Sequence, residues 1–584
     1  MKAEPQVRPS SVGVRNTGGA GARGSTTRRV DRVWASSLAI LVLPFGVALL
    51  RLATSRGPIF LGGDLAVIDL QVRRALGFHQ LLGPYSRYGW SHPGPLYFYL
   101  LSVLARVAGA GARTDFIGAL LINALSALGV VWVVRSRAGS WASLWAATCM
   151  AVLAIAFVGG VVNPGATPLM NPWNPYVVTF PLVLLGVLCA LGAAGSWLGI
   201  LGACLIGSFA VQTDVSTAPL VVALLAGTLV VRLVTATATR RRVAGTAPED
   251  GAEHRRRLAK PDWGIVAAAA ALVLVWVPTL VQQVTGKQGN VAAIWRFFTG
   301  PNSHNRLSSA LWSVATIERG LVTGVPRAVN GLTIIGGADP YALIVAGLVV
   351  ILGVGALAAG IRLHDRFIAF LGGASLVGSA VSVYAATRIS GPIFGYLVMW
   401  ELAAPLLALI GAGMAVLAWG ERPGRSIARS RRNLLPFGAV ALVACGTFSV
   451  EMGRLQPLSS FTDTDVELAV RAVTTRVPSR QPMFLGEAGA WSFGTVATFA
   501  GVFDSLDQRG YQLFVDEGRY ERIFGRFRRT GRSAADYVVL YPPGPAARTA
   551  SPQAVRTRTA VVVVSSSPAS GLLFASHDGV VPYP

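Results

Sequence analysis

Long apolar stretches recur along the whole chain, and they constrain its fold more than any other feature of the sequence. Most are close to the roughly 20 residues that a helix needs to cross the hydrocarbon core of a bilayer. The eleven stretches are Val33–Ala53, Asp115–Val134, Trp141–Val162, Tyr176–Ala194, Trp197–Val211, Pro219–Val234, Trp263–Val284, Tyr341–Ile361, Phe367–Ala386, Ile393–Trp419 and Leu434–Val450. The expected fold is therefore a polytopic α-helical membrane protein with about eleven transmembrane helices.

The composition agrees with this fold class, because 53% of the 584 residues are hydrophobic and only 13% are charged. The net charge of +24 would favour a nucleic-acid partner in a soluble protein. Here the basic residues lie in short segments between the apolar stretches, where they indicate orientation in a membrane instead. We therefore expect the lipid bilayer, and no nucleic acid, as a partner of the chain.

The basic segments all fall on the cytoplasmic side when the eleven spans are counted from a cytoplasmic N-terminus. They are the tail with Arg23, Arg28, Arg29 and Arg32, the pair Arg135 and Arg137, the loop 240–257, the pair Arg362 and Arg366, and the loop 422–432. The segments 62–99, 163–175 and 286–340 then lie outside, together with the C-terminal region. The expected location is the cell membrane, with a cytoplasmic N-terminus.

Hydropathy divides the chain into three regions. Residues 1–32 are rich in Gly, Ser, Thr and Arg and are expected to form a disordered cytoplasmic tail. Residues 33–451 form the transmembrane domain, whose first outer loop covers 54–114. Residues 452–584 are expected to form a soluble extracytoplasmic α/β domain, with helices between its first three strands. The runs that predict strands are 483–485, 511–515, 537–541 and 561–564.

One further apolar segment, Pro95–Ala110, is expected to lie at the membrane surface. Its uninterrupted helix, Leu96–Ala108, would be only about 20 Å long, against a hydrocarbon core of about 30 Å. Arg106 lies within this segment, and a twelfth span would place the later basic loops outside. We therefore predict an interfacial or re-entrant helix over 96–110 in the outer loop.

Asp64 and Asp69 lie in the outer segment that follows the first apolar stretch. Asp64 follows two glycines, which allow close approach of the backbone to a ligand, and it opens an apolar helical pattern. The same position is also typical of a carboxylate that caps a helix. Asp69 has Arg73 four residues later, which is the spacing of an ordinary ion pair on a helix. Both acids are candidate catalytic residues, and Asp64 is the stronger candidate.

The segment Gly83–Tyr99 displays basic and aromatic side chains from rigid turns. Its proline and glycine residues prevent a regular helix before residue 96. Arg87 and His92 could hold a phosphate there, and Tyr88 and Trp90 could stack a sugar. An aromatic belt at the membrane interface is the alternative interpretation.

Polar groups near the outer ends of later stretches are further candidates for substrate binding. Asp214 ends the fifth stretch, Gln283 the seventh and Arg388 the ninth. Such side chains are costly in lipid and are expected to face protein or water. Helix capping and packing hydrogen bonds are their alternative roles. No residues have the spacing of a metal site, and metal dependence stays open.

The order of these features resembles the GT-C class of integral membrane glycosyltransferases, as found in bacteria. An acid in the first outer loop is followed by the turn His-Pro-Gly-Pro at 92–95 and then by an aromatic helix. The resemblance implies that Asp64 is the catalytic base and that His92 lies near the phosphate of a polyprenyl-phosphate sugar donor. In the class the two acids are adjacent, whereas Asp64 and Asp69 are separated in this chain.

The expected function is transfer of a sugar from that lipid carrier to a glycan, glycolipid or protein of the cell envelope, on the outer face of the membrane. An inverting transfer needs a carboxylate that deprotonates the acceptor and groups that hold the leaving phosphate. Asp64 fits the first role, and Arg87 and His92 fit the second. A transporter or flippase, and a GT-C-like protein without catalysis, are the alternatives. Abundant Arg, with Lys only at positions 2, 260 and 287, is typical of GC-rich bacteria such as actinobacteria.

Overall fold

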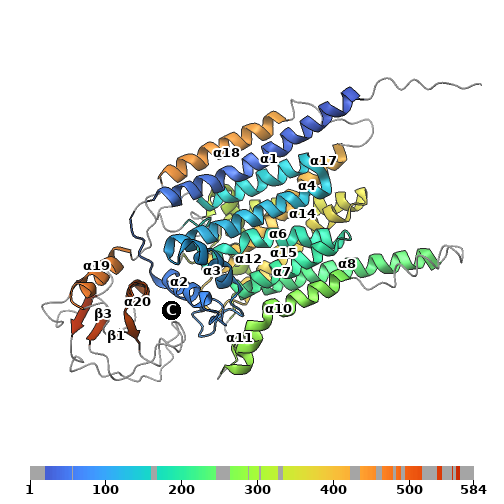
Figure 1. The fold of residues 1–584 in the computed structure, drawn as a ribbon. Coiled ribbons are helices and arrows are strands. Elements are labelled where there is room, and N and C mark those ends of the chain that lie inside the picture. The colour runs from blue at the N-terminus through green and yellow to red at the C-terminus, as the bar shows by residue number, and fades with distance from the viewer. Residues whose placement is uncertain are drawn as a thin grey trace, which may run out of the picture.

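Helices dominate the part of the chain that the structure describes, and the strands lie in the C-terminal region (Figure 1). The structure is a computed structural model. It describes residues 20–55, 57–158, 167–244, 263–286, 289–301, 304–325, 333–420, 434–454, 463–477, 482–487, 493–515, 536–541, 555–556 and 561–565.

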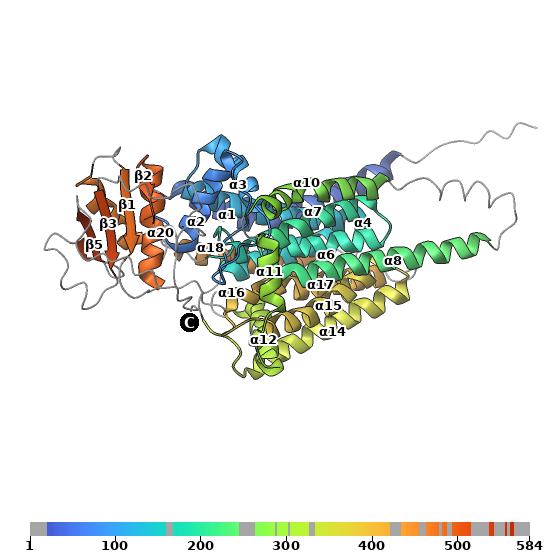
Figure 2. The same ribbon diagram turned by 90° about the horizontal axis from the view of Figure 1, so that it is seen from below.

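The long helices run side by side in one bundle (Figures 1 and 2). They are α1 (Ala20–Thr54), α4 (Ala112–Val158), α6 (Thr179–Ala193), α7 (Trp197–Thr213), α8 (Ala218–Ala244), α10 (Trp263–Thr285), α14 (Pro340–Leu363), α15 (Arg366–Thr387), α17 (Ala403–Gly420) and α18 (Leu434–Arg454). The shorter elements are α2 (Gly63–Leu76), α3 (Leu96–Ala108), α5 (Asn174–Val177), η2 (Val215–Thr217), α11 (Asn290–Thr299), α12 (Leu307–Thr323), α16 (Gly395–Val398) and η3 (Met399–Leu402).

Eight helical segments among the described residues are long and apolar enough to cross a membrane, which supports a multi-pass membrane protein. The predicted count of eleven is not reproduced. The count of eight takes each continuous helix as one span and includes only helices of at least 18 residues. α4 is counted once although it covers two predicted spans, α7 has only 17 residues, and α18 is not among the eight. α3 coincides with the uninterrupted helix predicted within 96–110, and with 13 residues it is too short to cross.

The two predicted spans within α4 are joined at Gly139. This residue has φ +81°, a left-handed conformation that favours glycine. The guanidinium of Arg135 lies 4.1 Å from the ring centre of Trp34, and the Ser143 hydroxyl lies 3.3 Å from that of Ser37. Residues on both sides of the kink therefore contact the same part of α1, as expected where two spans meet at one membrane face.

α1 begins at Ala20, within the region predicted as a tail, and continues through the first apolar stretch. Helix formation has a costly nucleus and cheap propagation, so a helix that is stabilised in the apolar stretch extends into the preceding residues. Residues 1–19 lie outside the described part of the chain.

The C-terminal region contains a five-stranded mixed sheet in the order β2-β1-β3-β5-β4. β1 pairs in parallel with β2 and β3, and β5 pairs antiparallel with β3 and β4. The parallel β1 and β2 need a crossover between them, and α20 supplies it. The elements are α19 (Asp463–Thr474), β1 (Pro482–Glu487), α20 (Phe493–Gln508), β2 (Gln512–Phe514), β3 (Asp536–Tyr541), β4 (Val555–Arg556) and β5 (Val561–Ser565). The helix expected between the second and third strands falls outside the described residues.

α2 lies between the helix bundle and the sheet (Figures 1 and 2). It packs against α3 on one side and against α20 on the other. Leu61, just before α2, belongs to the same buried hydrophobic cluster as Val466 of α19 and Phe499 of α20. The C-terminal region is thus attached to the bundle through the segment that leads to Asp64.

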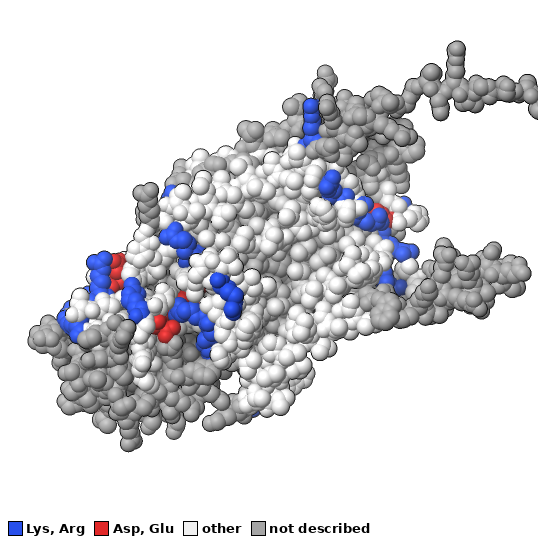
Figure 3. Space-filling view, viewed as in Figure 1, with Lys and Arg blue, Asp and Glu red and all other residues white. Residues whose placement is uncertain are grey.

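On the face shown in Figure 3, the described Lys and Arg side chains gather toward the two ends of the bundle, with uncharged surface between them.

Candidate functional site

Asp64 lies in the first turn of α2 and does not cap it. Gly62 is the N-cap residue, and Gly63 has φ +55°, a conformation that a residue with a side chain rarely adopts. The Asp64 carboxylate instead accepts a hydrogen bond from the indole nitrogen of Trp173, with Oδ2 and Nε1 2.9 Å apart. The two glycines therefore turn the chain so that the carboxylate points away from the backbone of its own helix.

The Asp64 side chain is accessible to solvent although protein surrounds it. This crowding removes hydration from the charged form and raises the pKa of the carboxyl, and the hydrogen bond from Trp173 partly opposes the shift. A carboxyl with a raised pKa is a stronger base when it is ionised. Accessibility and basicity are thus combined at Asp64.

Aromatic rings extend the site from Asp64. The ring of Trp173 lies 4.6 Å from that of Tyr396 and 5.1 Å from that of Tyr176, measured between ring centres. Tyr396 stacks on Phe394 at 6.0 Å. Neither Trp173 nor Tyr396 is among the site residues predicted above. For Tyr396 the sole signal in the sequence is the aromatic pair Phe394 and Tyr396 at the start of the tenth apolar stretch.

Arg87 lies on the other side of this aromatic group. Its guanidinium lies 4.9 Å from the ring centre of Tyr88 and 5.1 Å from that of Phe394, which are cation–π distances. It also donates a hydrogen bond to the Tyr88 hydroxyl at 2.7 Å, and that hydroxyl donates to the carbonyl of Ser390 at 2.8 Å. These contacts hold the positive charge against the segment that precedes α16.

Tyr396 connects the two charged ends of the site, because it contacts Trp173 on the Asp64 side and Phe394 on the Arg87 side. Its phenol group is also within electrostatic range of Asp64, Arg87, Tyr88 and Asp214. The structure therefore brings together four of the residues predicted from the sequence around a fifth that was not predicted. Trp90 lies beside them, because its ring stacks near Tyr88 at 6.3 Å.

His92 is buried, and its ring nitrogens face protein groups. The backbone N–H of Val215 donates to Nδ1 at 2.9 Å, and the side-chain nitrogen of Asn174 lies 3.3 Å from Nε2. Burial lowers the pKa of His92, although the carboxylate of Asp214, 3.9 Å away, acts in the opposite direction. His92 thus connects the turn at 92–95 to the end of α7 as a neutral hydrogen-bond acceptor.

Three other predicted residues have structural contacts in the described part of the chain. Asp214 caps η2, with its Oδ1 3.0 Å from the backbone nitrogen of Ser216. Gln283 accepts from the backbone nitrogen of Val291 at 3.0 Å, which stabilises the turn into α11. Arg388 donates to the carbonyl of Phe298 at 3.0 Å and contacts the ring of His304. Asp214 also interacts electrostatically with Tyr396.

Asp69 faces the C-terminal region rather than the aromatic group. Its side chain is fully buried, pairs with Arg73 and accepts a hydrogen bond from Gln508 of α20 at 3.0 Å. The ion pair with Arg73 is the one that the spacing predicted. Among the described residues, no group of three or more His, Cys, Asp or Glu side chains could hold a metal ion.

The comparisons with known proteins concern the fold. The chain matches no protein-family model and no curated protein. It is similar to the crystal structure of ArnT from Cupriavidus metallidurans in the apo state, with a TM-score of 0.52 and 14% identity over 92% of this chain and 98% of that chain. For the ArnT structure bound to undecaprenyl phosphate the TM-score is 0.52, with 15% identity over 93% of this chain and 98% of that chain.

A structural similarity at so low an identity shows only that the two folds are alike. It does not support the actinobacterial source expected from the sequence. The similarity covers nearly the whole length of both chains, so it includes the bundle, the outer loops and the C-terminal region. The resemblance to the GT-C class noted from the sequence is confirmed for the fold: the chain has the GT-C fold, as ArnT does.

Proposed function

We propose that this protein is a glycosyltransferase that moves a sugar from a polyprenyl-phosphate carrier to an acceptor on the outer face of the cell membrane. The observation that carries the proposal is that one aromatic group contacts both Asp64 and Arg87. Trp173 donates to Asp64 and lies beside Tyr396, and Tyr396 stacks on Phe394, whose ring centre is 5.1 Å from the Arg87 guanidinium. An accessible carboxylate and a cation thus lie at one aromatic group. The structure of ArnT, which has a similar fold, contains bound undecaprenyl phosphate.

The chemistry divides between these residues. Asp64 takes the proton of the acceptor hydroxyl while that oxygen forms a bond to the anomeric carbon of the sugar. The bond from this carbon to the phosphate oxygen breaks, and the carrier leaves as polyprenyl phosphate. The charge of Arg87 stabilises the phosphate as it gains negative charge, and Trp173 and Tyr396 offer rings on which a sugar can stack.

His92 and Asp69 have other roles in this proposal. His92 accepts a backbone hydrogen bond through Nδ1, so it positions the turn that carries Arg87 rather than neutralising the phosphate. Asp69 is occupied by Arg73 and Gln508. The acceptor is a cell-envelope glycan, glycolipid or protein, and no residue of the site selects among these.

The test is transfer from labelled polyprenyl-phosphate sugars by purified protein in lipid nanodiscs. Asp64→Asn keeps the shape of the side chain and removes its basicity, so we expect kcat to fall by roughly 10²- to 10⁴-fold. Glu467→Gln is the matched control, because it makes the same change in the Glu467–Arg471 pair on α19. It should leave transfer within about twofold of wild type.

Two results would contradict the proposal. One is full transfer by Asp64→Asn, which would exclude Asp64 as the base. The other is the absence of transfer by wild-type protein with each pentosyl and hexosyl donor, which would favour a transporter or a non-catalytic GT-C protein.

A further inference from the structure

α20 of the C-terminal region contacts α2 at both ends, and one of these ends carries Asp64. Asp64 occupies the first turn of α2, and Arg73 lies in its last turn. A helix is a stiff element, so a displacement of one end displaces the other. Whatever holds α20 against α2 therefore acts on the position of the Asp64 carboxylate.

At the Asp64 end, α20 lies against the segment that leads into α2, and Gly501 makes this close approach possible. A Cβ added to Gly63 would lie 3.5 Å from the Cβ of Ala497, and a Cβ added to Gly501 would overlap the carbonyl oxygen of Leu61. Leu61 and Gly63 directly precede Asp64 in the chain. The approach of α20 thus fixes the backbone from which the Asp64 side chain extends.

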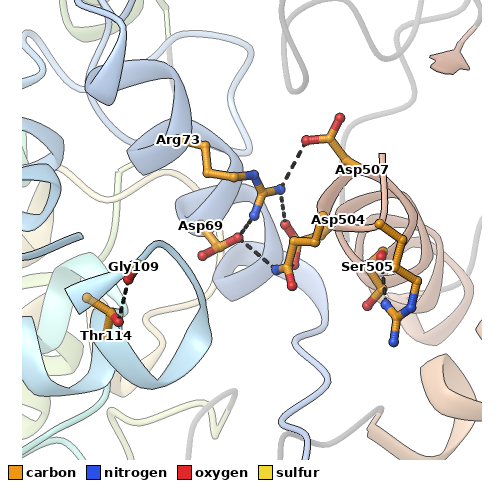
Figure 4. A network of polar contacts seen from close by, with 9 residues as sticks. Asp69, Arg73, Gly109, Thr114, Asp504, Ser505 and Asp507 are labelled. Atoms are coloured by element: carbon orange, nitrogen blue, oxygen red, sulfur yellow. Dashed lines mark hydrogen bonds and ion pairs between the residues drawn. The ribbon is translucent and has the colours of Figure 1, made fainter. Parts of the chain in front are cut away.

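At the other end, the contact is electrostatic (Figure 4). Arg73 pairs with Asp69 of its own helix, and its Nη2 also lies 2.6 Å from Asp504 and 3.2 Å from Asp507 of α20. Gln508 donates to both Asp69 and Asp504 at 3.0 Å. One guanidinium therefore joins carboxylates from both helices.

The burial of this network makes Arg73 hard to replace. The side chains of Asp69 and Asp504 have 0% and 1% of their surface exposed. Buried carboxylates without a counter-charge are strongly disfavoured, and they would repel one another here. Removal of the guanidinium should therefore separate α20 from α2 rather than leave the helices in place.

We propose that the C-terminal region is part of the catalytic unit, with α20 and Arg73 acting as positioning elements that hold the Asp64 carboxylate in its working place. The inference rests on the proposed function of Asp64. Arg73 does not touch the substrate in this scheme, and it acts through α2. Its loss should lower the rate of the chemical step more than the binding of the lipid donor, because Arg87 lies outside the interface.

The first measurement is independent of activity. Hydrogen–deuterium exchange of full-length protein in nanodiscs should show about tenfold faster exchange over 61–76 in Arg73→Ala than in wild type. Arg73→Lys keeps one charge and should restore most of the protection. Gly501→Val, which acts only through steric overlap, should also increase exchange over 61–63. Arg471→Ala is the control, because Arg471 pairs with the neighbouring Glu467 on the same helix.

The second measurement is the kinetics of sugar transfer. Arg73→Ala and Gly501→Val should lower kcat by about tenfold or more, with the KM for the donor changed less than about threefold. Because the loss of α20 removes part of the protein that surrounds the Asp64 end of α2, the pKa of Asp64 should fall and the acid limb of the pH profile should move to lower pH. A purely structural role of the interface would lower the amount of folded protein without moving this limb.

The two proposals can fail separately. Unchanged exchange over 61–76 in both Arg73→Ala and Gly501→Val would overturn the positioning role, whatever the activity. Faster exchange with unchanged kcat would overturn it as well. Absence of transfer by wild-type protein would instead overturn the proposed function, and the exchange data would still decide whether α20 holds α2.

Discussion

At the scale of single residues, the hydrogen bond between Trp173 and Asp64 is the most informative contact. It shows that Asp64 is engaged by a side chain from a distant loop instead of by its own helix. The indole N–H stabilises the ionised carboxylate and so lowers its pKa, while the surrounding protein raises the pKa. The pH at which Asp64 becomes a base thus depends on Trp173.

We predict that Trp173→Phe moves the acid limb of kcat/KM to higher pH. The substitution keeps an aromatic ring next to Tyr396 and removes only the donor, so the pKa of Asp64 should rise further. We expect about a tenfold lower kcat/KM on the acid limb, because a hydrogen bond to a charged group contributes about 1.5–3 kcal/mol. The measurement is the pH profile of transfer from the labelled donor. Trp276→Phe is the control, since its indole donates to Ser208 in the bundle; an unmoved limb in Trp173→Phe would contradict the prediction.

Sequence reasoning found the individual charged groups more easily than their partners. Asp64 and Asp214 were predicted from their position beside apolar stretches and Arg87 from its rigid aromatic turn, and all three interact electrostatically with Tyr396. Tyr396 itself could not be predicted, because its role depends on contacts between segments more than 300 residues apart, such as that between Tyr88 and Ser390 at a separation of 302. The phosphate role of His92 was inferred from the turn, whereas its burial and hydrogen bonds are tertiary.

At the scale of elements, the interface between α2 and α20 should respond to pH. Burial raises the pKa of Asp504 to about 6, although Arg73 and Gln508 act in the opposite direction. The other charged groups that face it are Asp69, Arg73, Asp507 and Asp115. Because the pKa is higher than the 3.9 of a free Asp, the docked state takes up a proton. Docking is therefore strongest below pH 4 and weakens as the pH rises to about 6.

The corresponding experiment compares α20 in wild type and in Asp504→Asn. The amide resembles the protonated carboxyl, so its docking should depend little on pH. In wild type, exchange over 493–508, corrected for the intrinsic rate, should be several-fold faster at about pH 8 than at about pH 5. Glu467→Gln should behave as wild type. Stronger protection of wild-type α20 at the higher pH would contradict the predicted direction of the pH dependence of docking.

The elements themselves were largely predictable, because hydrophobic periodicity and length are local properties. The four predicted strand runs lie on β1, β2, β3 and β5, and α3 begins and ends where its helix was expected. Boundaries were harder to predict where helix propagation or one glycine decides them, as at Ala20 and Gly139. The pairing of strands and the docking of α20 depend on contacts between distant residues, which periodicity does not encode.

At the scale of the whole molecule, the Ala20 end of α1 and the sheet lie at opposite ends of the bundle (Figure 1). If the bundle crosses the bilayer, these ends face opposite sides. We predict that a cysteine in place of the exposed Leu468 reacts with a membrane-impermeant maleimide in intact cells, because the positive-inside rule places the C-terminal region outside. A cysteine in place of Ala138, at the Gly139 kink, should react only after permeabilisation.

Both variants would be made in a background without the native cysteines, and both should react after permeabilisation, which is the control for reactivity. Labelling of the Ala138 position but not of the Leu468 position in intact cells would reverse the proposed orientation. It would also place Asp64 on the cytoplasmic side, away from the acceptors considered above.

The contact between Arg73 and Asp504 joins residues 431 positions apart. During synthesis the N-terminal part of a chain is made first, and every helix of the bundle is inserted before α20 leaves the ribosome. Until the last segment has been made, Asp69 and Arg73 of α2 can therefore pair with each other but not with α20. The candidate site is completed at the end of biogenesis, so a chain cut short after the bundle would carry Asp64 without the helix that holds it in place.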